Sequence, residues 1–364
     1  MNKIGIIGLG LIGGSIAKAL KYNDPNVFIV AMDSHTESLQ QALNEKVIDH
    51  YTTTLDSSFS SCHIIFFCTP VQKMMDLVPS LLPFISSQCI ITDVGSTKKA
   101  VMECMKQYQD RICFIGGHPM AGSEKTGYAA SKHYLFQNAY YILTPFPFTP
   151  LDQLQKLTDV ISSLGALPIT IEPTLHDFIT ASISHVPHVI AAALVHMVKE
   201  LDTEKGHMKQ LAAGGFKDIT RIASSSPDMW SQICMTNTEE ILQILSKMKE
   251  KLSDFENILI NRKEKELWDF FYNAQQYRNE FSSRNPGPFI KSYEIVVDIV
   301  DQPGVIATLA TLLSKHHINI KNIGIISNRE FENGVLQIIF ETQEDQKQSI
   351  DLLQQLGYQV YPKE

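Results

Sequence analysis

His118 is the residue whose surroundings most clearly indicate chemistry. It follows a short apolar run and two glycines, and Pro119 stiffens the turn after it. A histidine displayed on such a turn suits a general base near neutral pH, because its unperturbed pKa lies in that range. The alternative is a loop histidine whose ring is satisfied by the backbone. The glycine-rich setting favours the functional interpretation.

Arg221 is the candidate for binding an anion. Lys217, Asp218 and Arg221 are spaced by three and four residues, which places them on one face of a predicted helix. On an open surface such a face is solvated and contributes little. The neighbouring Phe216 and Ile222 indicate partial burial instead, where an arginine can capture a carboxylate with two hydrogen bonds. The sequence leaves both interpretations open.

His185 and His188 lie three residues apart on another predicted helix, a spacing that can bind a metal ion. No His-Glu-x-x-His pattern and no carboxylate partner accompany them. We therefore predict no metal site. The pair could line a polar pocket or make a hydrogen bond between helices, and each histidine could equally be structural.

A glycine-rich turn near the start of the chain predicts a dinucleotide site. An apolar strand leads into Gly8, Gly10 and Gly13, and a helix follows. Gly8 allows the tight turn, Gly10 lets the backbone approach a pyrophosphate, and Gly13 lets the helix pack closely on the strand. Leu11 and Ile12 lie in this turn, and the free N–H groups of the helix that follows from Ser15 would face the phosphates.

Asp33 is the predicted ligand of the cofactor's ribose. A second apolar run ends at this residue, twenty positions after Gly13. A carboxylate there accepts a hydrogen bond from a ribose 2′-hydroxyl and repels a 2′-phosphate, so NAD is favoured over NADP. His35 follows closely and could carry a charge that weakens this preference. Thr69, past the end of another strand, completes the predicted cofactor site.

The composition excludes several classes of protein. The chain has 364 residues, 44% of them hydrophobic and 19% charged, and a net charge of −8. This balance suits a soluble enzyme of two or three domains and disfavours nucleic acid or an anionic membrane as a partner. We expect no apolar run of membrane-spanning length and no signal peptide. The six cysteines form no Cys-x-x-Cys pair and indicate free thiols in the cytoplasm.

Strand and helix patterns divide the chain into three domains. Residues 1–172 alternate between the two, which predicts a Rossmann-type, mostly parallel, doubly wound sheet. Ligands of such sheets bind at the carboxyl ends of the strands, where Thr69, Ser96 and His118 fall. Ser96 or Thr97 is also placed to cap the next helix. Residues 173–281 are helical, with a helix over 176–194 kinked at Pro187 and a long, amphipathic segment over 239–271.

The third predicted domain follows a Ser/Pro/Gly-rich linker and covers residues 289–364. Its pattern of strands and helices is βαββαβ, typical of a small ferredoxin-like module. Asp301 and Gly304 lie in a loop that leads into its first helix, where backbone N–H groups could hold the carboxylate of an amino acid. Asn319, just inside the next predicted strand, could meet the amino group.

These motifs together resemble those of prephenate dehydrogenases of the TyrA family, with a tail that is similar to an ACT domain. The segments that carry the resemblance are 8–15, 93–98, 117–124, 184–188, 215–223 and 301–305. They span essentially the whole chain. The central segments are specific, whereas the N-terminal glycines and the ACT pattern alone are not.

The resemblance implies oxidative decarboxylation of prephenate by NAD to give 4-hydroxyphenylpyruvate. It gives His118 the role of polarising or deprotonating the C4 hydroxyl and Arg221 that of binding a substrate carboxylate. It further implies a homodimer and feedback inhibition by L-tyrosine bound to the ACT domain. The remaining positions implied to line, gate or support the substrate site are Ser96, Ser123, Glu124, His188 and Asp218.

Two rivals remain. An arogenate dehydrogenase shares this fold and chemistry but accepts an amino-acid side chain in place of the keto acid, and one polar residue can decide between them. A non-catalytic amino-acid sensor could retain NAD as a structural ligand. His118 and Arg221 argue against the sensor.

Overall fold

The computed structural model describes residues 3–122, 125–280, 293–300, 303–327 and 334–363. Its contacts form two compact units, residues 1–252 and 253–364. The division falls within one long helix.

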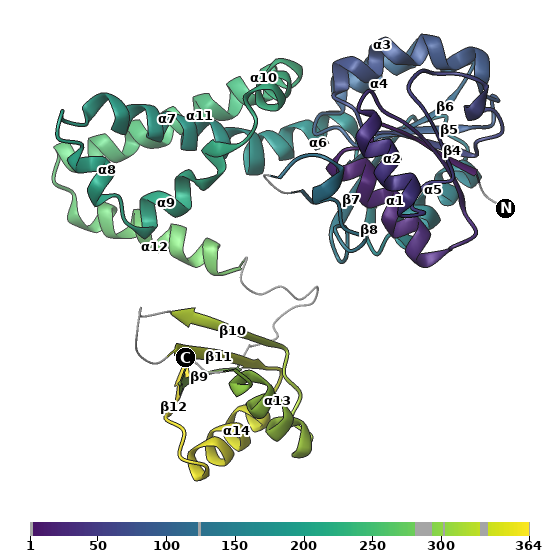
Figure 1. Cartoon of the computed structure of the whole chain (residues 1–364). Coiled ribbons are helices and arrows are strands. Elements are labelled where there is room, and N and C mark those ends of the chain that lie inside the picture. The colour runs from purple at the N-terminus through teal and green to yellow at the C-terminus, as the bar shows by residue number, and fades with distance from the viewer. Residues whose placement is uncertain (1–2, 123–124, 281–292, 301–302, 328–333, 364) are drawn as a thin grey trace. The chain divides into compact units, whose positions relative to one another are not determined.

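The first unit begins with an α/β region built on a single sheet (Figure 1). Its elements are β1 (Lys3–Ile7), α1 (Leu11–Asn23), β2 (Phe28–Met32), α2 (Thr36–Asn44), β3 (His50–Thr52), β4 (Ile64–Phe67), α3 (Val71–Leu81), β5 (Ile90–Asp93), α4 (Lys99–Lys106), β6 (Cys113–Pro119), β7 (Tyr140–Pro145), α5 (Leu151–Ser163) and β8 (Leu167–Thr170).

The sheet has the order β3-β2-β1-β4-β5-β6-β7-β8. Strands β1 to β6 are parallel in the order 3-2-1-4-5-6, the doubly wound arrangement of dinucleotide-binding domains. The predicted Rossmann-like, mostly parallel fold is thus confirmed. The exceptions are β7, which runs antiparallel to β6, and β8, which is parallel to β7. The strand order reverses between β1 and β4, which places a crevice for ligands at their carboxyl ends.

Two apolar clusters hold the helices on opposite faces of this sheet. Helices α1, α2 and α5 pack on one face and α3 and α4 on the other. Strand β4 shows why both faces are covered: Phe66 belongs to the first cluster and Phe67 to the second, and both are fully buried. Successive side chains of a strand point to opposite faces, so an uninterrupted apolar strand needs a helix layer on each side.

The chain then becomes helical. The elements are α6 (Pro173–Thr180), a π-turn (Ala181–His185), α7 (Val186–Leu201), α8 (His207–Leu211), α9 (Gly214–Thr220), a 3₁₀ turn (Arg221–Ser224), α10 (Pro227–Thr236), α11 (Thr238–Ile260) and α12 (Glu264–Glu280). We expected a kink at Pro187. The structure has a π-turn in this helix, which ends at His185, two residues before the proline. The long, amphipathic segment 239–271 is divided between α11 and α12, and Arg262 between the two helices adopts a φ of 49°.

One part of the helical segment is more apolar than we expected. The run Pro173–Leu201 has a mean hydropathy of 1.6, and among the described residues it is the one helix long and apolar enough to cross a membrane. The expectation that no run reaches this length therefore does not hold. Length and composition are weak support for a membrane span, because a core helix of a soluble protein meets the same criteria.

The second unit contains the end of α11, helix α12 and a four-stranded antiparallel sheet. The elements of the sheet region are β9 (Tyr293–Ile299), α13 (Val305–Lys315), β10 (Asn322–Ser327), β11 (Gly334–Phe340), α14 (Gln343–Gln355) and β12 (Val360–Lys363). The strand order is β10-β11-β9-β12. Alternate residues of β9, including Ile295 and Val297, are buried in an apolar cluster with α13 and α14.

Candidate active site

The glycine turn between β1 and α1 has the geometry of a phosphate cradle. Gly8 has a φ of +99°, and a Cβ there would lie 2.7 Å from the Cys68 carbonyl oxygen. A Cβ on Gly13 would lie 2.0 Å from the Gly8 carbonyl oxygen, so helix and strand could not approach as closely. In front of Gly10 there is open space, and no side chain caps α1. The first N–H groups of α1, on the half-buried Leu11 and Ile12, can therefore serve a phosphate.

Asp33 and Thr69 lie at the ends of the strands on either side of β1. The Asp33 carboxylate accepts hydrogen bonds from the Leu9 amide at 2.6 Å and the His35 amide at 2.8 Å. Burial raises the pKa of Asp33, but these hydrogen bonds and His35 outweigh it and the pKa is lowered. The carboxylate is therefore charged. Thr69 Oγ1 is buried and has no hydrogen-bond partner among the described residues, which fits a hydroxyl reserved for a ligand.

His118 ends up half-buried near the end of β6, and a buried ion pair fixes the backbone before it. Asp93 at the end of β5 accepts a hydrogen bond from the Gly117 amide at 3.0 Å and pairs with the fully buried Lys98. A Cβ on Gly117 would lie 2.5 Å from the Asp93 carbonyl oxygen, so the two strand ends can approach only at a glycine. Burial first, then the nearby His176, lowers the pKa of His118 well below 6.5. The ring is neutral at pH 7 and can accept a proton.

His118 also begins a chain of hydrogen bonds that the sequence analysis missed. Its Nδ1 lies 2.8 Å from Nε2 of His176, and His176 Nδ1 lies 2.7 Å from Asp177 Oδ1. The Asp177 carboxylate accepts hydrogen bonds from the backbone amides of Lys98 and Lys99 at 2.7 and 2.8 Å. It thereby caps α4.

The cap predicted for Ser96 or Thr97 is wrong, because no side chain within the helix's own segment caps α4. Thr97 instead donates a hydrogen bond to Thr236 at 3.0 Å, and Ser96 is left half-buried past the end of β5. Asp177 took the place of a local cap from a position 79 residues away.

His185 and His188 have separate partners. His185 is buried, and its Nδ1 lies 3.0 Å from the Asn237 amide nitrogen. His188 Nδ1 lies 2.9 Å from the Ser184 carbonyl oxygen, and its ring stacks on Trp230 with centroids 3.8 Å apart. His188 Nδ1 therefore donates, which leaves Nε2 as a free acceptor. Among the described residues, no group of three metal-ligating side chains exists.

Arg221 lies in the 3₁₀ turn after α9, not on one continuous helix face with Lys217 and Asp218. All three side chains are exposed within one chain, so the partial burial considered above is not seen here. Arg221 is near His188, because its charge contributes to lowering the pKa of that ring after burial does. In the described structure, Asp218 makes no ion pair with Arg221.

Three predicted residues, Ser123, Glu124 and Asp301, lie outside the described residues. Gly304 precedes α13 with a φ of +92°, and Asn319 is exposed in the loop before β10. The prediction that Asn319 lies inside a strand is wrong.

His176 and Asp177 were missed because nothing in the sequence pairs them with His118. A usable signal did exist: a His-Asp pair in the first turns of an apolar helix, which begins at Pro173, has to find partners when it is buried.

Comparison with known proteins agrees with this geometry. Residues 16–170 match the nucleotide-binding domain of prephenate dehydrogenase, and residues 172–273 match its dimerization domain. A prephenate dehydrogenase of Bacillus subtilis is 38% identical over 346 residues, covering 94% of this chain and 93% of the relative.

Two solved structures are also similar. The structure of Aquifex aeolicus prephenate dehydrogenase with hydroxyphenyl propionate and NAD+ has a TM-score of 0.73 and 30% identity, covering 77% of this chain and 98% of that one. Synechocystis arogenate dehydrogenase has a TM-score of 0.69 and 31% identity, covering 77% and 99%. On these matches, above all the one spanning 94% of its length, the chain belongs to the prephenate dehydrogenase family.

Proposed function

We propose that the protein is an NAD-dependent prephenate dehydrogenase, which oxidises and decarboxylates prephenate to 4-hydroxyphenylpyruvate. This proposal rests on a neutral, half-buried His118 that lies at the carboxyl ends of the strands, as the glycine turn does. The neighbour solved with NAD+ and a hydroxyphenyl acid supports the same ligand chemistry.

NAD fits the residues at this edge, and it supplies the hydride acceptor when bound. Gly8, Gly10 and Gly13 would shape the pyrophosphate site, with Leu11 and Ile12 offering N–H groups. Asp33 would hold the ribose, and the unpartnered Thr69 hydroxyl would take a further hydrogen bond. The charged Asp33 favours NAD over NADP.

His118 accepts the proton of the C4 hydroxyl as the C4 hydride leaves. The ring carboxylate then departs as carbon dioxide, and its bonding electrons make the ring aromatic. The C4 oxygen takes its proton back from His118, which gives the phenol of 4-hydroxyphenylpyruvate and restores the neutral ring of the base. Arg221 binds a substrate carboxylate by charge-assisted hydrogen bonds. His188, with Nε2 free, and Ser96 contribute polar contacts to the substrate. We assign Ser123, Glu124 and Asp218 to the lining, gating and support of the same pocket.

One absorbance assay tests the activity. Purified protein with NAD should form NADH on addition of prephenate, and the product should absorb as a hydroxyphenyl compound. L-Arogenate is the matched substrate, because the similar Synechocystis structure is an arogenate dehydrogenase. Higher kcat/KM on arogenate would reassign the substrate, and no NADH from either would favour the sensor.

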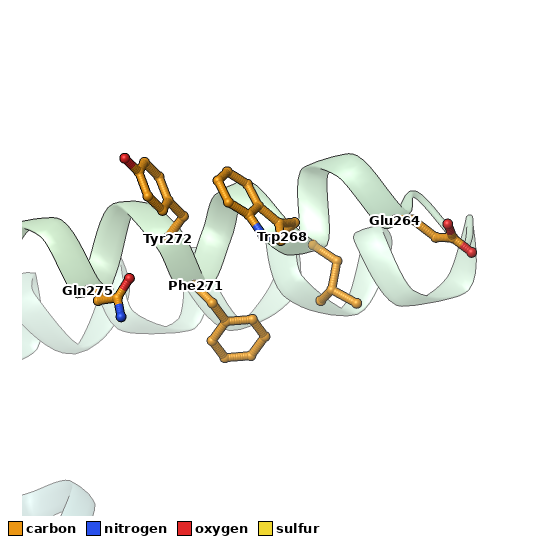
Figure 2. A pocket seen from close by; sticks show the side chains of 6 residues that line it. Glu264, Trp268, Phe271, Tyr272 and Gln275 are labelled. Carbon is orange, nitrogen blue, oxygen red and sulfur yellow. The ribbon is translucent and has the colours of Figure 1, made fainter.

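We further propose that the protein is a homodimer joined by its helical domain, residues 173–281. In one chain α7 buries only Val186 and Ala191, and α12 buries no residue. Trp268 and Phe271 project from α12 with 61% and 58% of their surface exposed, and Figure 2 shows these rings on the helix surface. The match to a dimerization domain supports a second copy of the chain as the partner that covers them.

The remaining proposals concern the two ends of the chain. We assign residues 1–172 to NAD binding and residues 289–364 to a ferredoxin-like ACT domain that binds L-tyrosine and inhibits the enzyme. Two features support the ACT assignment: the βαββαβ order of the elements from β9 to β12, and the left-handed backbone of Gly304 before α13. Backbone N–H groups where the loop with Asp301 and Gly304 leads into α13 would hold the ligand's carboxylate, and the exposed loop residue Asn319 would meet its amino group.

Truncation tests the ACT proposal. A chain ending at Asn285 and the full chain are titrated with tyrosine at fixed prephenate. Inhibition of the full chain alone supports the proposal, since a ligand can act only through its differential affinity for two states. Equal inhibition of both would place tyrosine in the catalytic pocket.

A further inference from the structure

His118 becomes a cation in the proposed reaction, although its surroundings oppose a positive charge. Burial and the nearby Lys98 cation both disfavour the protonated ring. Lys98 is itself paired with Asp93, so Asp93 is already committed to another cation. A second buried carboxylate, that of Asp177, connects to His118 through a single side chain.

The positions of the protons on His118 and His176 follow from the hydrogen bonds that Asp177 accepts at the other end of this connection. Asp177 accepts hydrogen bonds from the amides of Lys98 and Lys99, which can only donate. These contacts favour the carboxylate form, so the hydrogen bond at 2.7 Å is donated by His176 Nδ1. A neutral His176 protonated at Nδ1 has its lone pair on Nε2 and accepts from His118 Nδ1 at 2.8 Å. His118 is then left with its lone pair on Nε2.

We propose that His176 and Asp177 are positioning residues that hold His118 in the tautomer with a basic Nε2 and stabilise the cation formed when it takes the substrate proton. This inference deepens the proposed function and rests on the role given there to His118. The proton from the C4 hydroxyl bonds to Nε2 of His118, and Nδ1 keeps its proton and its hydrogen bond. Asp177 supplies negative charge without being protonated. The same logic orients the base of a catalytic triad, where the carboxylate also keeps its charge.

The connection also joins the two regions that form the site. His118 is on β6 of the sheet, whereas His176 and Asp177 are on α6, and the carboxylate binds the first turn of α4. Both positioning side chains are fully buried, so water does not compete for these hydrogen bonds. A purely structural role would explain the cap of α4. It would not require His176 between the cap and the base.

The test compares His176→Leu, His176→Gln and Thr180→Val in the full-length chain. Leu removes the acceptor for His118, whereas the carboxamide oxygen of Gln can still accept from Nδ1. Thr180→Val is the matched control: Thr180 is one turn further along α6 and equally buried, and it donates only to the backbone carbonyl oxygens of His176 and Asp177, not to their side chains. It should keep the parent kcat even if it lowers stability.

We expect His176→Leu to lower kcat by roughly 10- to 100-fold, by analogy with the loss seen when the partner that orients a metal-bound histidine is removed. KM for prephenate and NAD affinity should stay as in the parent. His176→Gln should recover part of kcat. Equal kcat in the Leu variant and the parent would overturn the inference, as would equal losses in all three variants.

A spectroscopic measurement reports the tautomer directly. In protein with ¹⁵N-labelled histidine and bound NAD, the His118 signals are those lost in His118→Asn. The inference predicts a protonated Nδ1 and a bare Nε2 in the parent and a mixture of tautomers in His176→Leu. An unchanged tautomer would overturn it. If His118→Asn itself kept full turnover, the proposed role of His118 would be the part that fails.

Discussion

The α/β region and the helical segment differ in how much apolar surface each buries within one chain. Two apolar clusters enclose the sheet from both faces, and side chains such as Phe66 are fully buried. In the helical segment one small cluster contains only Ala181, Val186 and Ile241 as buried members. The first region is thus stabilised by its own sequence, whereas the second presents the kind of surface that needs a partner. The proposed site takes residues from both.

The largest expected effect tests whether the α/β region carries the chemistry. His118→Asn should lower kcat by roughly 10²–10⁴, the usual cost of losing a general base. NAD affinity should not change, because the glycine turn and Asp33 are untouched. Stopped-flow kinetics and NAD titration measure the two quantities. Near-normal turnover would mean that another group is the base.

The next effect is the pH dependence of stability that the buried His185 of the helical segment should cause. Burial, opposed in part by Asp177, lowers the pKa of His185 to about 4. Between pH 6.5 and about 4 the unfolded chain therefore binds a proton that the folded chain does not. This group alone should reduce the free energy of unfolding by about 3 kcal/mol as pH falls through that window. Urea unfolding at several pH values should show a flatter slope for His185→Asn. An identical slope would mean that His185 is solvated.

A third effect tests whether the helical segment binds substrate. Arg221→Ala should raise KM for prephenate roughly 10- to 100-fold, equivalent to the loss of a charged hydrogen bond of about 1.5–3 kcal/mol. NAD affinity should stay constant. Lys217→Ala is the control, since that charge is also exposed and on the preceding helix. Equal KM values in both variants would mean that Arg221 lies on a solvated surface and does not bind the substrate.

A fourth effect tests whether a second chain covers the exposed apolar side chains of the helical segment. If a second chain covers α12, Trp268→Ala should weaken the dimer by about 1–2 kcal/mol. Its thermal midpoint should then depend more steeply on protein concentration. Phe148→Ala is the control, because this ring in the α/β region is 56% exposed. Sedimentation equilibrium measures the dimer dissociation constant of the parent and of both variants. A parent protein that is monomeric throughout would contradict the proposal.

The smallest effect concerns cofactor choice within the α/β region. Asp33→Ser should narrow the preference for NAD over NADP by roughly tenfold, about 1.4 kcal/mol, because the repelling charge is removed. Comparing kcat/KM for the two cofactors measures it. Unchanged discrimination would place Asp33 away from the ribose.

The difference between local and distant contacts decides how much the sequence could predict. Gly8, Gly13 and His118 were found because a strand, a turn and a helix in direct succession restrict one another. The cap of α4 was assigned to Ser96 or Thr97 by a local rule, and Asp177 replaced it from 79 residues away. His176 was missed for the same reason. The exposure of Arg221 could not be foreseen, because burial between helices depends on a packing partner that periodicity does not identify.

The π-turn Ala181–His185 accommodates one extra residue without changing the rotational phase of α7 relative to α6. Its i→i+5 hydrogen bonds take about one residue more per turn than an α-turn. Deleting one residue of the turn, such as Ile183, would let the segment relax into a regular α-helix. Because the deletion removes only the residue that the wider turn accommodates, His188 would keep its place against Trp230. A deletion within α7 itself has no such turn to absorb it, and it would rotate the residues that follow by roughly 100°.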